Sequence, residues 1–139
     1  MTTDWAHLPN AVHIDRVIAA TKAHRNQWDE AWNTVQDVGR GKARGAVRNA
    51  AWAEAWNTVQ DVGRYAEYNA AWLVAWETAL EATLAGAWCA LLALCAYDDC
   101  AYMIDSDPGE LAILAAFGDP RAVLLLSACK VFHSIKEVV

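Results

Sequence analysis

The sequence has little proline and glycine, a deficit of basic residues and no long apolar run. Three prolines and seven glycines are few residues that interrupt a helix, and no stretch of alternating valine, isoleucine or threonine is present from which to build a β-sheet. The longest uncharged segment, between Glu81 and Asp98, has 16 residues, whereas a membrane-spanning helix needs about 20 predominantly apolar ones. The N-terminus lacks a basic segment followed by an apolar one, so we expect neither a signal peptide nor a membrane protein.

The charge balance and the cysteines exclude further classes of protein. Eleven basic residues against 17 acidic ones give a net charge of −6, which disfavours nonspecific binding to DNA or RNA. The four cysteines have neither C-x-x-C spacing nor a neighbouring histidine at ligand spacing, so we expect no metal site and no cofactor. Buried free thiols are the better interpretation, and they indicate a reducing compartment, the cytoplasm. The four are Cys89, Cys95, Cys100 and Cys129.

Alanine and tryptophan are abundant instead. The 139 residues include 29 alanines and eight tryptophans, and alanine is the best helix former of the common residues. The composition therefore predicts an all-α protein. A chain of this length is typical of one domain, and we expect residues 1–139 to form a single helical domain.

The most specific feature is an internal repeat. Residues 28–40 (WDEAWNTVQDVGR) and 52–64 (WAEAWNTVQDVGR) differ only at Asp29 and Ala53, which indicates a duplication. A third, degenerate copy begins at Trp72, where polar positions of the earlier copies have become apolar. We therefore expect the third copy to be the most deeply buried.

Each unit places two tryptophans four residues apart, on one face of a helix. Successive units start 24 and then 20 residues apart, and a 20-residue step rotates that face by roughly 200°. Either the chain breaks near Gly63 into antiparallel helices that share a Trp-lined core, or one long helix presents its tryptophans to two neighbours. A break at Gly39–Gly45, where three glycines cluster, is expected in both cases.

Further helix boundaries are read from local signals. A helix is predicted to begin near residues 9–10, and Asp107–Pro108 and Asp119–Pro120 each combine an N-cap with proline at the first helical position. We expect a bundle of about five helices around an apolar central helix at Ala79–Ile104. Three residues are expected to point inward from the first helix: Val12, Val17 and Ile18.

The tryptophan pairs of the first two units have two interpretations. They fill the core between alanine-rich helices, or their flat faces line a ligand pocket together with nearby guanidinium and amide groups. Stacking faces beside arginine and asparagine are what a nucleotide-like ligand requires. The candidate ligand-binding residues are Trp28, Trp32, Arg40, Arg48, Asn49, Trp52, Trp56 and Arg64.

Two other segments carry charge. Gly39–Arg48 contains four basic residues and three glycines, and it is either a solvated connection or an anion-contacting loop. Asp98 and Asp99 follow the apolar helix, and we expect at least one of them near the core, in an ion pair with an arginine or a hydrogen bond with a tyrosine, or with a raised pKa as a general acid or base. No nucleophile motif or metal-ligand cluster is present, so the sequence gives little reason to expect an enzyme.

The repeated Trp-x-x-Ala-Trp and Asn-Ala-Ala-Trp units, the stretch at residues 96–102 and the later Gly-Asp-Pro-x-Ala-Val-Leu-Leu-Leu resemble a group of small Ala/Trp-rich helical proteins from phage and bacterial genomes. Members of this group are labelled hypothetical or putative immunity proteins. The resemblance covers roughly residues 28–126 and implies a role in genetic conflict, in the host cell cytoplasm if the chain is phage-encoded.

Two functions follow as hypotheses. The first is a noncatalytic, homo-oligomeric binding protein that sequesters a nucleotide-derived immune signal, of the cyclic nucleotide or ADP-ribose type, in a pocket of Trp and Arg side chains. The 56% hydrophobic content motivates the homo-oligomer, because so much apolar surface is hard to bury in one short chain. The alternative is an immunity or anti-defence protein that binds a toxin or defence protein directly.

Overall fold

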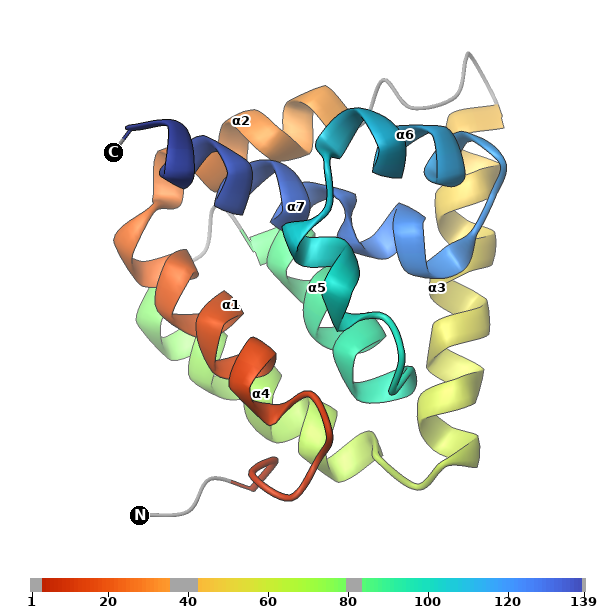
Figure 1. The fold of residues 1–139 in the computed structure, drawn as a ribbon. Helices are drawn as coiled ribbons and strands as arrows, with labels where there is room; N and C mark the ends of the chain where they lie inside the picture. The colour runs from red at the N-terminus through yellow and green to blue at the C-terminus, as the bar shows by residue number, and fades with distance from the viewer. Residues whose placement is uncertain (1–3, 36–42, 80–83, 139) are drawn as a thin grey trace.

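Helices form the regular structure of the chain wherever the computed structural model describes it, which is at residues 4–35, 43–79 and 84–138 (Figure 1). These ranges contain seven α-helices, one short 3-10 helix and no strand, which confirms the all-helical class. The elements are α1 (Ala11–Ala23), α2 (Arg25–Val35), α3 (Ala43–Asp61), α4 (Tyr65–Ala79), α5 (Leu84–Ala96), η1 (Ala101–Asp105), α6 (Pro108–Ala116) and α7 (Pro120–Val138).

The expected number of about five helices is wrong, because the described residues form seven α-helices. His24 separates α1 from α2 with a non-helical backbone conformation (φ −134°, ψ 50°). Gly63 and Gly118 end α3 and α6 with φ values of 72° and 83°, in the left-handed region that favours glycine. Each of these residues lies in the break between one helix and the next.

Gly63 decides between the two arrangements of the repeat. Its N–H donates to the carbonyl of Gln60 at 3.1 Å, and the N–H of Arg64 donates to the carbonyl of Val59 at 2.8 Å. These two hydrogen bonds form a glycine C-cap, so the chain breaks here. The expected antiparallel pairing is wrong, since α4 turns away from α3 and runs beside α1 (Figure 1).

The expected break at Gly39–Gly45 falls mostly outside the described residues. Helix α2 ends at Val35 and α3 already begins at Ala43, so Gly45 belongs to a helix. The backbone around Arg48 is also helical, and the basic segment is therefore not a loop along its whole length. Residues 39–42 of this segment lie outside the described residues.

Helix α5 is the centre of the structure, and it is shorter than the expected Ala79–Ile104. The residues of α5 from Leu91 to Ala96 are all buried, and α1, α2, α3, α4 and α7 pack around the helix (Figure 1). It ends at Ala96, and Asp98 and Asp99 follow in the turn after the helix. The chain continues as a turn and then as η1.

The helix start signals are confirmed by the structure. The carboxylate of Asp107 accepts a hydrogen bond from the N–H of Glu110 at 3.1 Å, with Pro108 as the first residue of α6. Helix α7 likewise begins at Pro120. In α1, Val17 is buried, whereas the inward orientation expected for Val12 is wrong, since 69% of that residue is exposed. Five residues of helix rotate a side chain by about 500°, which places Val12 and Val17 on different faces.

The expectation that the third copy is the most buried is also wrong. Trp28, from the first copy, is fully buried, while 41% of Trp76 from the third copy is exposed. Trp76 stacks on Trp72 with ring centroids 5.6 Å apart and packs against Trp88 at 6.2 Å. These three tryptophans form a cluster that remains partly open to solvent.

Gly86 lies where α5 packs closely against α2 and α7. A methyl group at this position would lie 2.8 Å from Cβ of Ser127 and 3.3 Å from Cε3 of Trp28. We expect Gly86→Ala to lower the free energy of unfolding by about 1–2 kcal/mol, because an overpacking cost of about 1–3 kcal/mol exceeds the gain of up to about 1 kcal/mol in helix propensity. Urea denaturation measures the change, and a stabilised variant would show that the helices are free to move apart.

Candidate functional site

The predicted ligand-binding residues are distributed over several places in the structure. Trp28 is entirely buried in the core, between α2, α5 and α7. The guanidinium of Arg48 lies over the ring of Trp32 at 5.3 Å from its centroid, so these two residues contact one another directly. Asn49 is exposed on α3, and Trp52 is half-buried against the core. Arg40 lies outside the described residues.

Trp56 has a different environment from Trp32, although both occupy the same position of the repeat. Its ring packs edge to face on Tyr65, with centroids 5.5 Å apart, and on Tyr68 at 6.0 Å. These three residues and Trp72 line a small pocket of about 200 Å³ where α3 meets α4, together with Asn69. Trp56 is therefore a predicted ligand-binding residue that lines a pocket.

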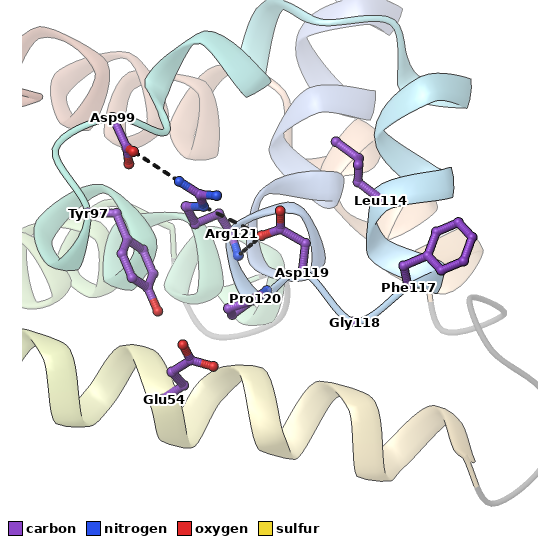
Figure 2. A pocket seen from close by; sticks show the side chains of 9 residues that line it. All are labelled: Glu54, Tyr97, Asp99, Leu114, Phe117, Gly118, Asp119, Pro120 and Arg121. Carbon is purple, nitrogen blue, oxygen red and sulfur yellow. Dashed lines mark hydrogen bonds and ion pairs between the residues drawn. The ribbon is translucent and has the colours of Figure 1, made fainter.

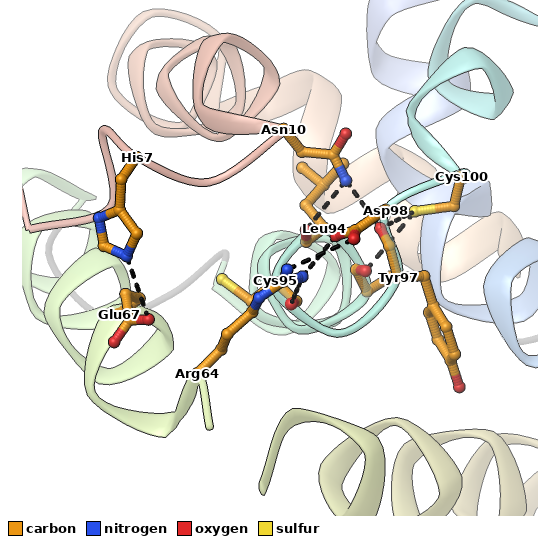
Figure 3. A network of polar contacts seen from close by, with 10 residues as sticks. His7, Asn10, Arg64, Glu67, Leu94, Cys95, Tyr97, Asp98 and Cys100 are labelled. Atoms are coloured by element: carbon orange, nitrogen blue, oxygen red, sulfur yellow. Dashed lines mark hydrogen bonds and ion pairs between the residues drawn. The ribbon is translucent and has the colours of Figure 1, made fainter. Parts of the chain in front are cut away.

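The guanidinium of Arg64 holds the C-terminal end of α5 in place (Figure 3). Its Nη1 donates to the backbone carbonyl of Cys95 at 3.2 Å and to a carboxylate oxygen of Asp98, while Nη2 lies 3.3 Å from the other oxygen of Asp98. The hydrogen bond with Asp98 raises the pKa of Arg64. Because the charge of Arg64 is neutralised within the chain, this arginine is poorly placed to bind a phosphate.

Other side chains complete the same helix end. The amide of Asn10 donates to the carbonyls of Leu94 at 3.0 Å and Tyr97 at 2.7 Å (Figure 3). The thiol of Cys100 also lies 3.4 Å from the carbonyl of Tyr97. The last carbonyls at a helix end have no partner within their own helix. Here Asn10 satisfies them from a distant part of the chain, and Cys100 from the turn that follows.

Asp98 and Asp99 are both in surface ion pairs. Asp98 pairs with Arg64, and a carboxylate oxygen of Asp99 accepts from Nη1 of Arg121 at 3.0 Å. The expected ion pairs are confirmed, but the expectation that one carboxylate lies near the core is wrong, because 55% and 73% of the two side chains are exposed. Arg64 directly precedes α4, and Arg121 lies in the first turn of α7. Their ion pairs fix the turn that follows α5 at the protein surface.

A hollow of about 680 Å³ lies beside this turn (Figure 2). Arg121 occupies its centre, with Nε 3.5 Å from the carboxylate of Asp119 in addition to its pair with Asp99. Glu54 of α3 and the ring of Tyr97 face each other across the hollow. Burial raises the pKa of Tyr97, and the hydroxyl remains neutral at physiological pH. The residues that line the hollow are Glu54, Tyr97, Asp99, Leu114, Phe117, Gly118, Asp119, Pro120 and Arg121.

Helix α6 exposes large apolar side chains next to this hollow. The exposed fractions are 59% for Ile113, 43% for Leu114 and 85% for Phe117. We call these three residues the α6 face. Ile113 and Leu114 precede Phe117 by four and three positions, so they are its neighbours on the helix surface. Leu111 and Ala115, on the opposite side of the helix, are buried. Large apolar side chains grouped on a surface are typical of an interaction site.

The α6 face and the hollow were not predicted from the sequence. The available signal is that α6 is apolar around its whole circumference, with Leu111, Ala112, Ile113 and Leu114 in succession. A short surface helix of this kind cannot bury every side, so one face remains outside. The sequence contains no indication of which face that is.

The cysteines are free and buried, as expected. Burial raises the pKa of Cys89, Cys95 and Cys100 to about 12 in each case, so these thiols are protonated at physiological pH and unreactive. Within the described residues, no group of three or more His, Cys, Asp or Glu side chains is placed to hold a metal ion. A search of the same residues for a helix long and apolar enough to cross a membrane finds none.

Comparison of the chain with protein-family models, with curated proteins and with solved structures finds no match. The resemblance to phage and bacterial immunity proteins therefore stays a prediction from the repeat motifs. Any assignment of function to this chain has to rest on its own surfaces and pockets.

Proposed function

We propose that this chain is a noncatalytic binding protein that docks a protein partner on the α6 face and in the adjoining hollow. The observation that carries the proposal is Phe117, which is 85% exposed beside a hollow of about 680 Å³. Aromatic side chains are frequent anchors of protein interfaces, and they dominate binding where a neighbouring pocket excludes water. In the context of genetic conflict, such a partner is a toxin or a defence protein.

The charge of the hollow defines the chemistry of the partner. Glu54, Asp99 and Asp119 contribute three carboxylates, and Arg121 contributes one positive charge. The whole chain carries a net charge of −6. A partner with an apolar side chain flanked by lysine or arginine is therefore complementary to this surface. A second copy of the chain fits less well, because it would bring the same negative charge to the interface.

The test is a selection from a displayed library of random peptides against the folded protein. We expect enrichment of peptides that combine an aromatic or aliphatic residue with lysine or arginine. Phe117→Ala should weaken the binding of a selected peptide by about 30-fold in calorimetry, since removal of a central anchor costs about 2 kcal/mol. Asp99→Asn and increasing salt should also weaken it.

Val12→Ala is the matched control for Phe117→Ala, because Val12 is a 69% exposed apolar residue on α1. This variant should leave peptide binding unchanged. The proposal is wrong if no peptide is enriched, or if the enriched peptides bind the Phe117→Ala variant as tightly as the original protein. Sedimentation of the protein alone tests the expected homo-oligomer. If the protein is a dimer and the Phe117→Ala variant is a monomer, a second copy of the chain binds at the α6 face in place of a different protein.

Sequestration of a nucleotide-derived signal is a second candidate function, favoured by the guanidinium of Arg48, which lies beside the aromatic face of Trp32. Heat denaturation of the purified protein, followed by mass spectrometry of the supernatant, tests it. Recovery of an intact nucleotide supports this function, and recovery of a chemically altered nucleotide indicates an enzyme. A supernatant without nucleotide after incubation with cyclic nucleotides and ADP-ribose derivatives would contradict it.

A further inference from the structure

The pocket between α3 and α4 is lined almost entirely by aromatic rings. Trp56 comes from α3, while Tyr65, Tyr68 and Trp72 come from the first two turns of α4, and Asn69 adds one amide. Tyr68 is buried, Trp56 and Trp72 are half-buried, and Tyr65 is 49% exposed at the rim. The pocket thus has a closed inner side and an open outer side.

The angles between the rings favour one class of ligand. The ring planes of Tyr65 and Tyr68 are inclined at 89° and 84° to that of Trp56. A flat base stacks best on a single face or between parallel faces, whereas perpendicular faces enclose a compact group from several sides. The volume of about 200 Å³ also lies below the roughly 300–1,000 Å³ of pockets that enclose a whole drug-sized ligand.

The electrostatics of the pocket favour a cation. Each aromatic face carries negative charge density, which attracts an ammonium group within about 6 Å of the ring centroid. The five lining residues include no lysine or arginine. The neighbouring Arg64 directs its guanidinium to Asp98 and to the carbonyl of Cys95. At the equivalent position of the first repeat, the face of Trp32 already holds the guanidinium of Arg48.

We propose that Trp56, Tyr65, Tyr68 and Trp72 form an aromatic cage that binds a quaternary ammonium group. The ligand enters from the side of Tyr65, and its methyl groups contact the faces of the rings. Asn69 at the rim contacts the remainder of the ligand. This site is separate from the α6 face, so either proposal stands or falls without the other.

The test uses tetramethylammonium and choline as probes, in calorimetry and in proton NMR at constant ionic strength. We expect both to bind, with an upfield shift of the methyl resonance that reports contact with aromatic faces. The neutral isostere of choline, 3,3-dimethylbutan-1-ol, should bind about tenfold more weakly, because it lacks the charge. Equal binding of this isostere, or tighter binding of adenosine than of choline, would overturn the proposal.

Two variants and a matched control locate the site. Tyr65→Leu and Trp56→Leu should each weaken the binding of tetramethylammonium about tenfold or more. Tyr102→Leu, at a tyrosine that is 65% exposed on η1, should leave it unchanged. Circular dichroism checks that each variant is folded. Binding that survives in both Tyr65→Leu and Trp56→Leu would place the probe elsewhere and contradict the cage.

The same group occurs in small molecules and in trimethylated lysine side chains. Titration with choline and with a peptide that contains one trimethyllysine distinguishes these sources. Tighter binding of the peptide would identify a modified protein as the ligand, and tighter binding of choline a small molecule. If neither binds, the proposal fails.

Discussion

Replacement of Trp28 by alanine is expected to lower the free energy of unfolding by about 3–5 kcal/mol. Trp28 is fully buried, and it packs where α2 approaches Gly86 of α5 and Ser127 of α7. Truncation of the indole removes a large apolar surface from the core and leaves a cavity between three helices. Urea denaturation, followed by circular dichroism, measures this change.

Trp76→Ala is the control for the loss of an indole. Because 41% of Trp76 is exposed, this substitution should cost clearly less than Trp28→Ala. A cost below about 1 kcal/mol for Trp28→Ala would show that Trp28 is not part of the core, and would return it to the candidate binding residues.

The stability of the protein is expected to fall steeply with pH above about 9. Burial raises the pKa of Cys89, Cys95 and Cys100 to about 12, from an ordinary thiol value of 9.0. Between these values the unfolded chain loses thiol protons that the folded chain keeps, so rising pH favours unfolding. Each thiol should contribute on the order of 1 kcal/mol per pH unit, and burial of Tyr68 raises its pKa in the same direction.

The free energy of unfolding, measured from pH 7 to 11 by urea denaturation, provides the test. The curve should be flat below the ordinary thiol pKa and fall above it. Cys95→Ala should give a smaller slope above pH 9, whatever its effect at neutral pH, because one thiol no longer titrates. A free energy that stays constant up to pH 10.5 would mean that the thiols are accessible in the folded state.

The parts of the fold that depend on local signals were predictable from the sequence. Asp107 and Pro108 begin α6 because the carboxylate satisfies an N–H of the first turn, and that contact spans only three residues. The end of α5 was not predictable in this way. Its last carbonyls are satisfied by Asn10 and Arg64, which are 84 and 31 residues distant from their respective acceptors, Leu94 and Cys95. No local pattern indicates such partners.

The repeat shows why the site was only partly predictable. Trp32 and Trp56 have the same neighbours in sequence, but Arg48 lies over one and two tyrosines pack on the other. The identical residues predict an identical helix face. The residues that each face contacts come from other parts of the chain, so the two tryptophans have different surroundings. The α6 face was missed for a similar reason, since packing on α7 decides which side of α6 stays exposed.

The central claim is that a protein partner binds at the α6 face. Chemical-shift mapping of the ¹⁵N-labelled protein, titrated with a selected basic and apolar peptide, tests it most directly. We expect the largest shifts at residues 113–121 and at Glu54 on the opposite side of the hollow. Shifts confined to residues 56–72, or spread evenly over the surface, would contradict the claim.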